Sequence, residues 1–390
     1  MTHEQGAAHR VPFLDLARQY ASLREEIDEA VARVLSRGWY VLGEEVAAFE
    51  REFAAYCDVE HAVGVNSGTD AIHLALRAVG VRTGDGVVTV PNVSAPTACA
   101  IEAAGARPVY VDVDPSTMNL DPESLRRVLK SPPGGLRVTA IVPVHLYGLP
   151  APMEEIGEIA KAFGVVVVED AAQGHGARWN DRPVGGLSAA GCFSFYPTKN
   201  LGAAGDAGAV VTNDAEIARL VRGLRNYGEV AKYQNRSQGF NSRLDEIQAA
   251  ILRVKLRHLD RWVGTRRDLA ERYRESFQGS GLSFQDDPGG RSHAYHLFVV
   301  RTNRRESFQE ALKRQGVDSA IHYPTPLHLQ ESQRYLGYRL GDFPQSERAC
   351  REVVSLPLYP ELRPDEIQRV IAAALESAEE SSREPRLGNP

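Results

Sequence analysis

One lysine, Lys199, stands between an apolar segment and a glycine-rich segment in the stretch CFSFYPTKNLGAAGDAG. Upstream, Glu169 and Asp170 close another apolar segment, VVVVED. A partly desolvated lysine beside a second cation loses its proton more easily than a free side chain, and such an amine suits Schiff-base chemistry. A carboxylate at the end of a buried strand can hold a ring nitrogen protonated. The alternatives are a surface lysine and a structural cap or ion pair.

A phosphate site is the second chemistry that the sequence indicates. In NSGTDA, the residues Gly68, Thr69 and Asp70 would begin a helix whose first N–H groups point toward an anion. Ser194, five residues before Lys199, could add a hydroxyl. Such residues also cap ordinary helices, so the motif alone is not specific. The glycines after Lys199 lack the G-x-G-x-x-G pattern, which excludes a dinucleotide motif there. An anion-binding turn, a carboxylate for a ring nitrogen and a Schiff-base lysine together describe a site for pyridoxal 5′-phosphate.

The elements that must position these residues are those of an α/β protein. Continuous apolar segments alternate with helical patterns, which is typical of a mostly parallel sheet covered on both faces. Seven such segments are found, at residues 61–68, 86–92, 108–114, 137–145, 164–170, 191–196 and 208–214. Ligands of such sheets bind at the carboxyl ends of the strands, where the residues above lie.

A smaller α+β unit is predicted after two long helical stretches at 214–228 and 242–277. Its pattern is a strand at 294–300, a helix at 305–316, an extended segment at 319–328 and helices near 344–353 and 364–380. We expect an N-terminal arm and first helix, a large domain, a small C-terminal domain and a disordered tail. Their bounds are 1–40, 41–255, 256–380 and 381–390.

The composition excludes several classes of protein. The 390 residues are 43% hydrophobic and 25% charged, which is typical of globular proteins. A net charge of −6 with scattered basic residues argues against a nucleic-acid partner. Four cysteines without a CxxC motif argue against a zinc site or disulfides and fit a reducing cytosol. No apolar run approaches the ~20 residues that span a bilayer, so we expect a cytoplasmic protein with no membrane partner and no metal.

The sequence also resembles the DegT/DnrJ/EryC1/StrS family of sugar aminotransferases from residue 11 to near residue 362. The matching motifs are RGWYVLGEEVAAFEREFAAYC, NSGTDA, PVHLYG, VEDAAQGHGA, FSFYPTKNLGAAGDAGAVVTND, LRNYG and GFNSRLDEIQAAIL. Several long motifs in the right order make chance agreement negligible. The resemblance implies the fold of type I pyridoxal-phosphate-dependent transferases, with a seven-stranded sheet in the large domain.

The resemblance implies a role for each matching position. Lys199 would bind the cofactor as a Schiff base, Asp170 would pair with the pyridine nitrogen, and Gln173 would contact the ring hydroxyl. The phosphate contacts would be Gly68, Thr69, Asp70, Ser194 and, from a second subunit, Asn241. The active unit is therefore expected to be a homodimer with shared sites.

One position departs from the family pattern. The family usually places an aromatic residue where VPNVSAPTACA has Ala95, which leaves the residue that stacks on the cofactor ring open. Substrate contacts are predicted for His322 and Tyr323, and for Trp39 and Tyr40, which could equally pack in an interface.

His145 and Tyr147 in PVHLYG could line the site, and a satisfied core histidine is the alternative reading of His145.

We interpret the chain as an enzyme that transfers an amino group from L-glutamate to a nucleotide-linked keto-sugar in amino-sugar biosynthesis. Two stretches, VPFLDLARQY and KYQNRSQGFNSRLDEIQAA, look closer to members that act on dTDP-3-keto-6-deoxyhexoses. A dTDP-4-keto sugar is the alternative, and an aminocyclitol precursor comes third. Dehydratases of the family carry histidine in place of Lys199, and a non-catalytic regulatory protein would be expected to have lost Lys199 or Asp170.

Overall fold

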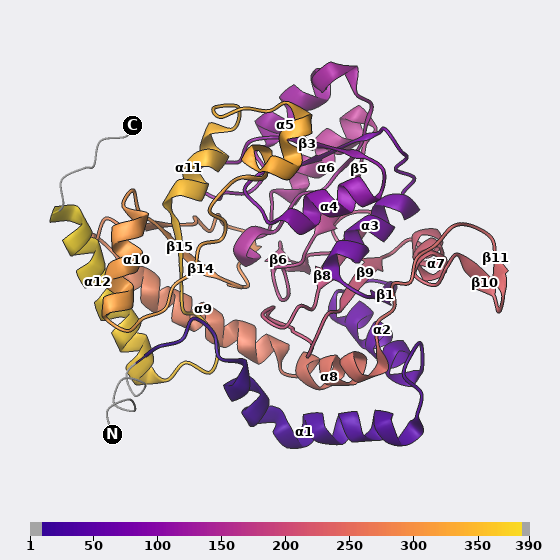
Figure 1. Ribbon diagram of the computed structural model, residues 1–390, viewed down its shortest axis with the longest axis horizontal. Helices are drawn as coiled ribbons and strands as arrows, with labels where there is room; N and C mark the ends of the chain where they lie inside the picture. The colour runs from indigo at the N-terminus through magenta and orange to yellow at the C-terminus, as the bar shows by residue number, and fades with distance from the viewer. Residues whose placement is uncertain (1–9, 384–390) are drawn as a thin grey trace.

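A seven-stranded sheet forms the centre of the fold in the computed structural model, which describes residues 10–383 (Figure 1). Its strand order is β1-β9-β8-β5-β4-β2-β3. Strand β9 is antiparallel to both of its neighbours, and the other pairs are parallel. The strands are β1 (His61–Val65), β2 (Gly86–Thr89), β3 (Arg107–Tyr110), β4 (Val138–Ile141), β5 (Val166–Asp170), β8 (Ala190–Ser194) and β9 (Gly208–Thr212). The predicted mostly parallel sheet is confirmed, and each strand lies within or directly beside its predicted segment.

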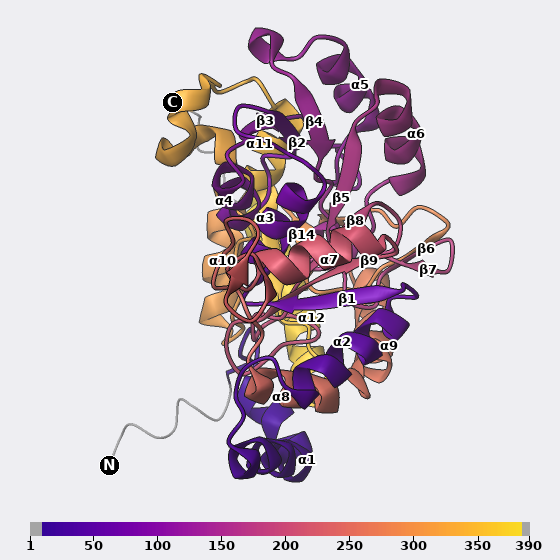
Figure 2. The same ribbon diagram turned by 90° about the vertical axis from the view of Figure 1, so that its right-hand side faces the viewer.

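Both faces of this sheet are buried, because successive side chains of a strand point to opposite sides. Val87 packs in one apolar cluster with Ile72 and Ile101, whereas Val88 packs in another with Ile156. One face is covered by α3 (Gly68–Ala78), α4 (Ala95–Ala103) and α7 (Ala215–Leu224). The other face is covered by α2 (Glu44–Tyr56), α5 (Pro122–Lys130), α6 (Met153–Phe163) and α8 (Glu246–Leu256). Figure 2 shows α4 and α6 on opposite sides of the strands.

The N-terminal helix α1 (Leu16–Arg37) lies along α8 at the lower edge of Figure 1. Its apolar stripe, with Leu23, Ile27 and Val34, packs against Ile251 of α8 and Trp262 of α9 (Leu259–Ser276). Asp15 caps the helix by accepting a hydrogen bond from the N–H of Arg18. Helix α1 thus lies within residues 1–40, where an N-terminal arm and a first helix are predicted.

A second, antiparallel sheet is formed by β12 (Ser283–Phe284), β14 (Phe298–Arg301) and β15 (Val353–Leu356). Helices α10 (Arg305–Arg314) and α12 (Pro364–Arg383) pack on one another beside it. Helix α11 (Pro344–Glu352) and the 3-10 turns Leu327–Leu329 and Glu331–Leu336 complete this part of the chain. The short strands are β6 (Arg178–Trp179), β7 (Arg182–Pro183) and β13 (Arg291–Ser292), which form one sheet, and the hairpin strands β10 (Glu229–Ala231) and β11 (Gln234–Asn235). Two further 3-10 turns are Pro133–Gly135 and Leu146–Gly148.

Four predicted elements differ from the structure. The helical stretch 242–277 is two helices that meet near His258, and α8 begins only at Glu246. The strand expected at 294–300 begins at Phe298, because the backbone before it is hydrogen-bonded to the turn at 147–148. Residues 353–356 form β15, where only the end of a helix was expected. The tail expected from 381 is still helical to Arg383, and residues 384–390 lie outside the described part.

We propose to keep the division into a large and a small domain near residue 256, where α8 ends. None of the helices in the described part of the chain combines the length and the apolar character needed to span a bilayer. Within residues 10–383, no group of His, Cys, Asp and Glu side chains could hold a metal ion, and all four cysteines are free.

Candidate active site

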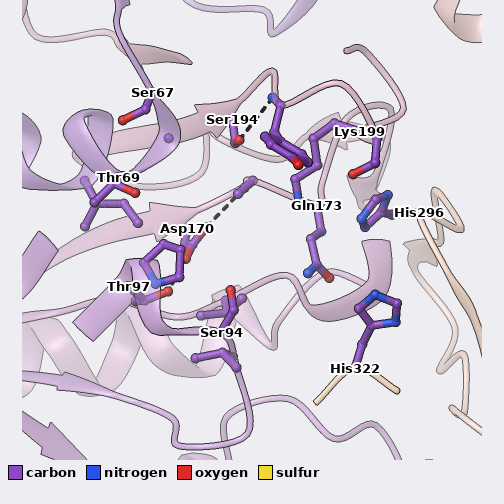
Figure 3. A pocket seen from close by; sticks show the side chains of 18 of the residues that line it. Ser67, Thr69, Ser94, Thr97, Asp170, Gln173, Ser194, Lys199, His296 and His322 are labelled. Atoms are coloured by element: carbon purple, nitrogen blue, oxygen red, sulfur yellow. Dashed lines mark hydrogen bonds between the residues drawn. The ribbon is translucent and has the colours of Figure 1, made fainter. Parts of the chain in front are cut away.

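Two adjacent parallel strands carry the central residues of the candidate site to one edge of the sheet. Asp170 is the last residue of β5 and Ser194 the last of β8, and Asp170 is paired with Cys192 across these strands. A cavity of about 400 Å³ opens at this edge, lined among others by Lys199, Gln173 and Asp170 (Figure 3). The structure therefore brings the predicted Schiff-base lysine and the predicted ring-nitrogen carboxylate into one pocket.

Strand alternation explains how FSFY positions the lysine. Phe193 and Phe195 are fully buried and pack edge-on against Phe53 of α2. Ser194 therefore points the opposite way, into the pocket. The chain then turns through a hydrogen bond from the N–H of Lys199 to the carbonyl of Tyr196. The aromatic anchor thus fixes the backbone from which the Lys199 side chain reaches the cavity.

The amine of Lys199 is less basic than an ordinary lysine. Burial lowers its pKa to about 8, and the nearby carboxylate of Asp170 counteracts part of that effect. A larger fraction of this amine is consequently unprotonated near neutral pH than for a lysine in water, whose pKa is about 10.4. An unprotonated amine is the form that attacks a carbonyl group.

Asp170 is buried and held by two hydrogen bonds. Thr97 Oγ1 donates to Oδ2 at 2.8 Å, and the N–H of Ala172 donates to Oδ1 at 3.1 Å. Burial raises the pKa of this carboxyl group, while the hydrogen bond from Thr97 is the largest effect that lowers it. A carboxylate in this setting gains from a cationic partner in the pocket.

Glu169, one residue earlier, points to the other side of the strand. It accepts hydrogen bonds from the N–H groups of Gly185 and Leu187 and from the hydroxyl of Ser188. The imidazole Nε2 of His145 lies 3.0 Å from its carboxylate. The His145 Nδ1 accepts from the N–H of Ala151, so Nε2 carries the proton and donates to Glu169. His145 is therefore a satisfied core histidine.

The N-terminus of α3 forms the opposite end of the pocket. Ser67 caps this helix by accepting from the N–H of Asp70, and Gly68 and Thr69 follow it. A Cβ atom on Gly68 would lie 2.5 Å from the Cβ of Ser194, so only glycine permits this close approach. Helix N–H groups and two hydroxyls, those of Thr69 and Ser194, therefore converge as an anion would require (Figure 3).

Gln173 is oriented by its neighbours. Its Oε1 accepts from the N–H of Tyr147 at 2.6 Å, and its Nε2 donates to the hydroxyl of Tyr323 at 3.1 Å. The hydroxyl of Tyr147 donates to the carbonyl of His322. Tyr147 thus supports two groups of the pocket, whereas Gln173, His322 and Tyr323 line the cavity itself. The His322 ring is neutral near pH 7, since burial and the charge of Lys199 lower its pKa to about 4.

Four predicted site residues do not line this cavity in the single chain. The Asp70 carboxylate points away and accepts a hydrogen bond from Ser242. Asn241 is exposed and pairs with the backbone of Asn226. Trp39 and Tyr40 are also exposed, with 64% and 48% of their surfaces accessible. Asn241, Trp39 and Tyr40 thus contribute nothing to the cavity of the single chain, and their roles stay predictions.

The sequence analysis missed several residues of the pocket, among them Thr97 and His296. Thr97 lies in α4, the helix that follows β2, and the polar residues after that strand end could have been considered as candidates. His296 lies far along the chain and belongs to no distinguishing motif. In the segment after β2, Ala95 is exposed and outside the pocket, which is lined instead by Val93, Ser94 and Pro96. This segment gives the pocket small and aliphatic side chains and no aromatic ring.

The residues present fit pyridoxal 5′-phosphate. The cavity has an anion cradle at Gly68, where a Cβ would collide with Ser194, together with a buried carboxylate and an amine of lowered pKa. Gly68, Thr69 and Ser194 would hold the phosphate, Asp170 the ring nitrogen and Lys199 the aldehyde carbon.

Comparisons with known proteins agree with this geometry. The profile of the DegT/DnrJ/EryC1/StrS aminotransferase family matches residues 21–375. The chain is 46% identical to a dTDP-3-amino-3,4,6-trideoxy-alpha-D-glucose transaminase of Streptomyces venezuelae, over 95% of this chain and 97% of the relative. It is 44% identical to a pleiotropic regulatory protein of Geobacillus stearothermophilus, over 93% and 96% of the two chains.

A solved structure also matches nearly the whole fold. The crystal structure of S. venezuelae DesV in complex with a ketimine intermediate superposes with a TM-score of 0.91 at 46% identity, covering 95% of this chain and 99% of that one. The expected fold of type I pyridoxal-phosphate-dependent transferases is thereby confirmed. Profile, sequence and structure all confirm the resemblance, and the chain belongs to the DegT/DnrJ/EryC1/StrS aminotransferase family.

Proposed function

We propose that the protein transfers an amino group from L-glutamate to a nucleotide-linked 3-keto-6-deoxyhexose, using pyridoxal 5′-phosphate. The observation that carries the proposal is the shared pocket of Lys199 and Asp170 beside the anion cradle at Gly68. The cofactor, when bound, supplies an electron sink for the carbon that loses its proton. The name of the S. venezuelae relative, a 3-amino sugar transaminase, supports C3 as the position that is aminated.

Each pocket residue has a part in this proposal. Nζ of Lys199 binds the cofactor and then moves the transferred proton, since its lowered pKa lets it act as a base near neutral pH. Asp170, held by Thr97, keeps the ring nitrogen charged. Gln173, whose side chain is held by Tyr147 and Tyr323, contacts the ring and orients it. His322 and Tyr323, which line the same cavity, would contact the sugar.

We further propose a homodimer with shared sites in the cytoplasm. Asn241 lies near two exposed aromatic residues, Tyr40 and Tyr227. The N–H of Glu246, in the stretch that follows Asn241, donates to the carbonyl of Tyr40, and Asn241 itself pairs with Asn226, the neighbour of Tyr227. Trp39, Tyr40 and Tyr227 are large apolar side chains that stay exposed in one chain. A symmetric interface would cover these rings and carry Asn241 to the partner's phosphate.

A direct test uses purified holoenzyme, L-glutamate and dTDP-linked 3-keto and 4-keto sugars, with products identified by mass spectrometry. We expect an amino sugar from the 3-keto substrate and formation of 2-oxoglutarate in equal amount. The matched control is Lys199→Ala, which should give neither product. Amination of the 4-keto sugar alone would move the substrate assignment to C4.

A regulatory protein of the same fold is the second candidate, because one relative carries a regulatory name. Such a protein needs no working amine in its pocket. The retained pair of Lys199 and Asp170 favours catalysis. Absence of any amino transfer, with cofactor fully bound, would favour the regulatory alternative.

A further inference from the structure

A second cavity adjoins the candidate active site. Its volume is about 150 Å³, and three of its lining residues, Thr198, His296 and His322, also line the larger pocket. Figure 3 shows His296 and His322 together on one side of that pocket, away from Ser67 and Thr69. The smaller cavity therefore extends the active site beyond the two histidines.

The wall of this cavity is apolar except at one point. Five of its residues are apolar, among them Phe13, Leu297 and Leu356, and its one permanent cation is Arg266 of α9. Burial and the charges of Lys199 and Arg266 lower the pKa of His296 well below its ordinary value, so this imidazole is neutral. Its Nδ1 is buried without a hydrogen-bond partner among the described residues. The cavity thus combines an apolar passage with a single positive charge.

Arg266 is buried, with 4% of its surface exposed, and forms no ion pair within the described part of the chain. Its Nη1 donates to the carbonyls of Leu358 at 2.7 Å and Tyr295 at 3.2 Å, with a longer contact of 3.4 Å to that of His296. Its Nε has no partner. Burial lowers the pKa of Arg266 to about 10, and the carboxylate of Glu361 counteracts part of that effect from beyond ion-pair distance. A buried guanidinium without an ion pair is costly, so the site gains when an anion enters.

We propose that Arg266 binds the side-chain carboxylate of the amino donor, whose methylene groups lie in the apolar cavity. This inference rests on the proposed aminotransferase function and names the feature that selects glutamate. A short aliphatic chain that ends in a carboxylate matches an apolar cavity with one guanidinium, which recognises carboxylates through paired N–H donors. Arg266 is thus a specificity-determining residue for the donor half of the reaction.

The test compares two donors with carbon chains of equal length, L-glutamate, whose side chain ends in a carboxylate, and L-norvaline, whose side chain ends in a methyl group. Single-turnover amination of the holoenzyme is followed by the absorbance of the cofactor. We expect the wild type to prefer glutamate. Arg266→Met should lower the rate with glutamate by roughly 10- to 100-fold, the factor for losing a hydrogen bond to a charged group, and leave the rate with norvaline nearly unchanged. Binding of glutarate to the holoenzyme, measured by calorimetry, should weaken by a similar factor.

Arg267→Met is the matched control. Arg267 is the neighbouring arginine of α9 and also donates to backbone carbonyls, those of His293 and Gly176, but it lines neither cavity. Its loss should leave the glutamate-to-norvaline ratio and glutarate binding at the wild-type values. If Arg266→Met does not fold, Arg266→Lys serves the same comparison and should retain part of the preference.

Three outcomes would overturn the inference. They are a wild type that uses both donors equally, an Arg266 variant that keeps the full preference, and one that loses both rates in parallel, as a purely structural role would cause. Failure of the proposed function has a different signature, because then no amino acid would aminate the wild-type cofactor at all.

Discussion

Thr97→Val should make the carboxylate of Asp170 harder to form. The valine has nearly the same shape, but it removes the hydroxyl that donates to Oδ2 at 2.8 Å in a buried site. A hydrogen bond to a charged group contributes about 1.5–3 kcal/mol. Since one pKa unit corresponds to about 1.4 kcal/mol, the pKa of Asp170 should rise by about one to two units. Burial already raises this pKa, so the change adds to an existing shift.

The higher pKa of Asp170 should make the stability loss of the cofactor-free Thr97→Val variant depend on pH. Above the folded pKa of Asp170 the charged carboxylate has lost its donor, and the variant should be less stable by about 1.5–3 kcal/mol. Below the ordinary aspartate pKa of about 3.9 the group is protonated in folded and unfolded chains alike, and the difference should largely vanish. Urea unfolding between about pH 3 and pH 8 measures both limits.

Thr97→Ser is the control, because serine keeps the hydroxyl while losing the methyl group. We expect its pH dependence to follow the wild type. In the holoenzyme, the acid limb of kcat/KM should move to higher pH in Thr97→Val and stay in place in Thr97→Ser. A stability loss in Thr97→Val that does not change with pH would refute the reasoning, since it would point to packing rather than to the charge of Asp170.

Three further predictions concern the cofactor and the dimer. Lys199→Ala should lose the covalent link to the cofactor, seen in the mass of the protein after borohydride reduction and denaturation, together with amino transfer; normal turnover would contradict the assignment. Asp170→Asn should fold normally and lower turnover on the order of 10²- to 10³-fold, the loss expected without an electrostatic stabiliser, whereas unchanged turnover with a lower Tm would favour a structural ion pair. Mixed inactive chains of Lys199→Ala and Asn241→Ala should recover roughly a quarter of the wild-type site activity if each site uses both subunits. No recovery after verified subunit exchange would place Asn241 outside the shared site.

Local sequence already determined the strands and their chemistry. Val and Ile runs between helical patterns predict a parallel sheet, because a strand buried on both faces must be apolar throughout. A polar residue that ends such a run then lies at the ligand-binding edge, as Asp170 and Ser194 do. Gly68 could be assigned to the start of α3 for the same local reason.

Only the tertiary structure decided which distant residues meet. Thr97 reaches Asp170 because their elements converge at one sheet edge, and no periodicity encodes that approach. Arg266 belongs to a helix that has an ordinary amphipathic pattern, yet packing buries it near His296 with no ion pair among the described residues. A strand was expected from Ala294, but β14 begins only at Phe298, because the backbone before it is hydrogen-bonded to the turn at Gly148. Sequence patterns report local periodicity, whereas burial and partner choice depend on contacts between segments far apart in the chain.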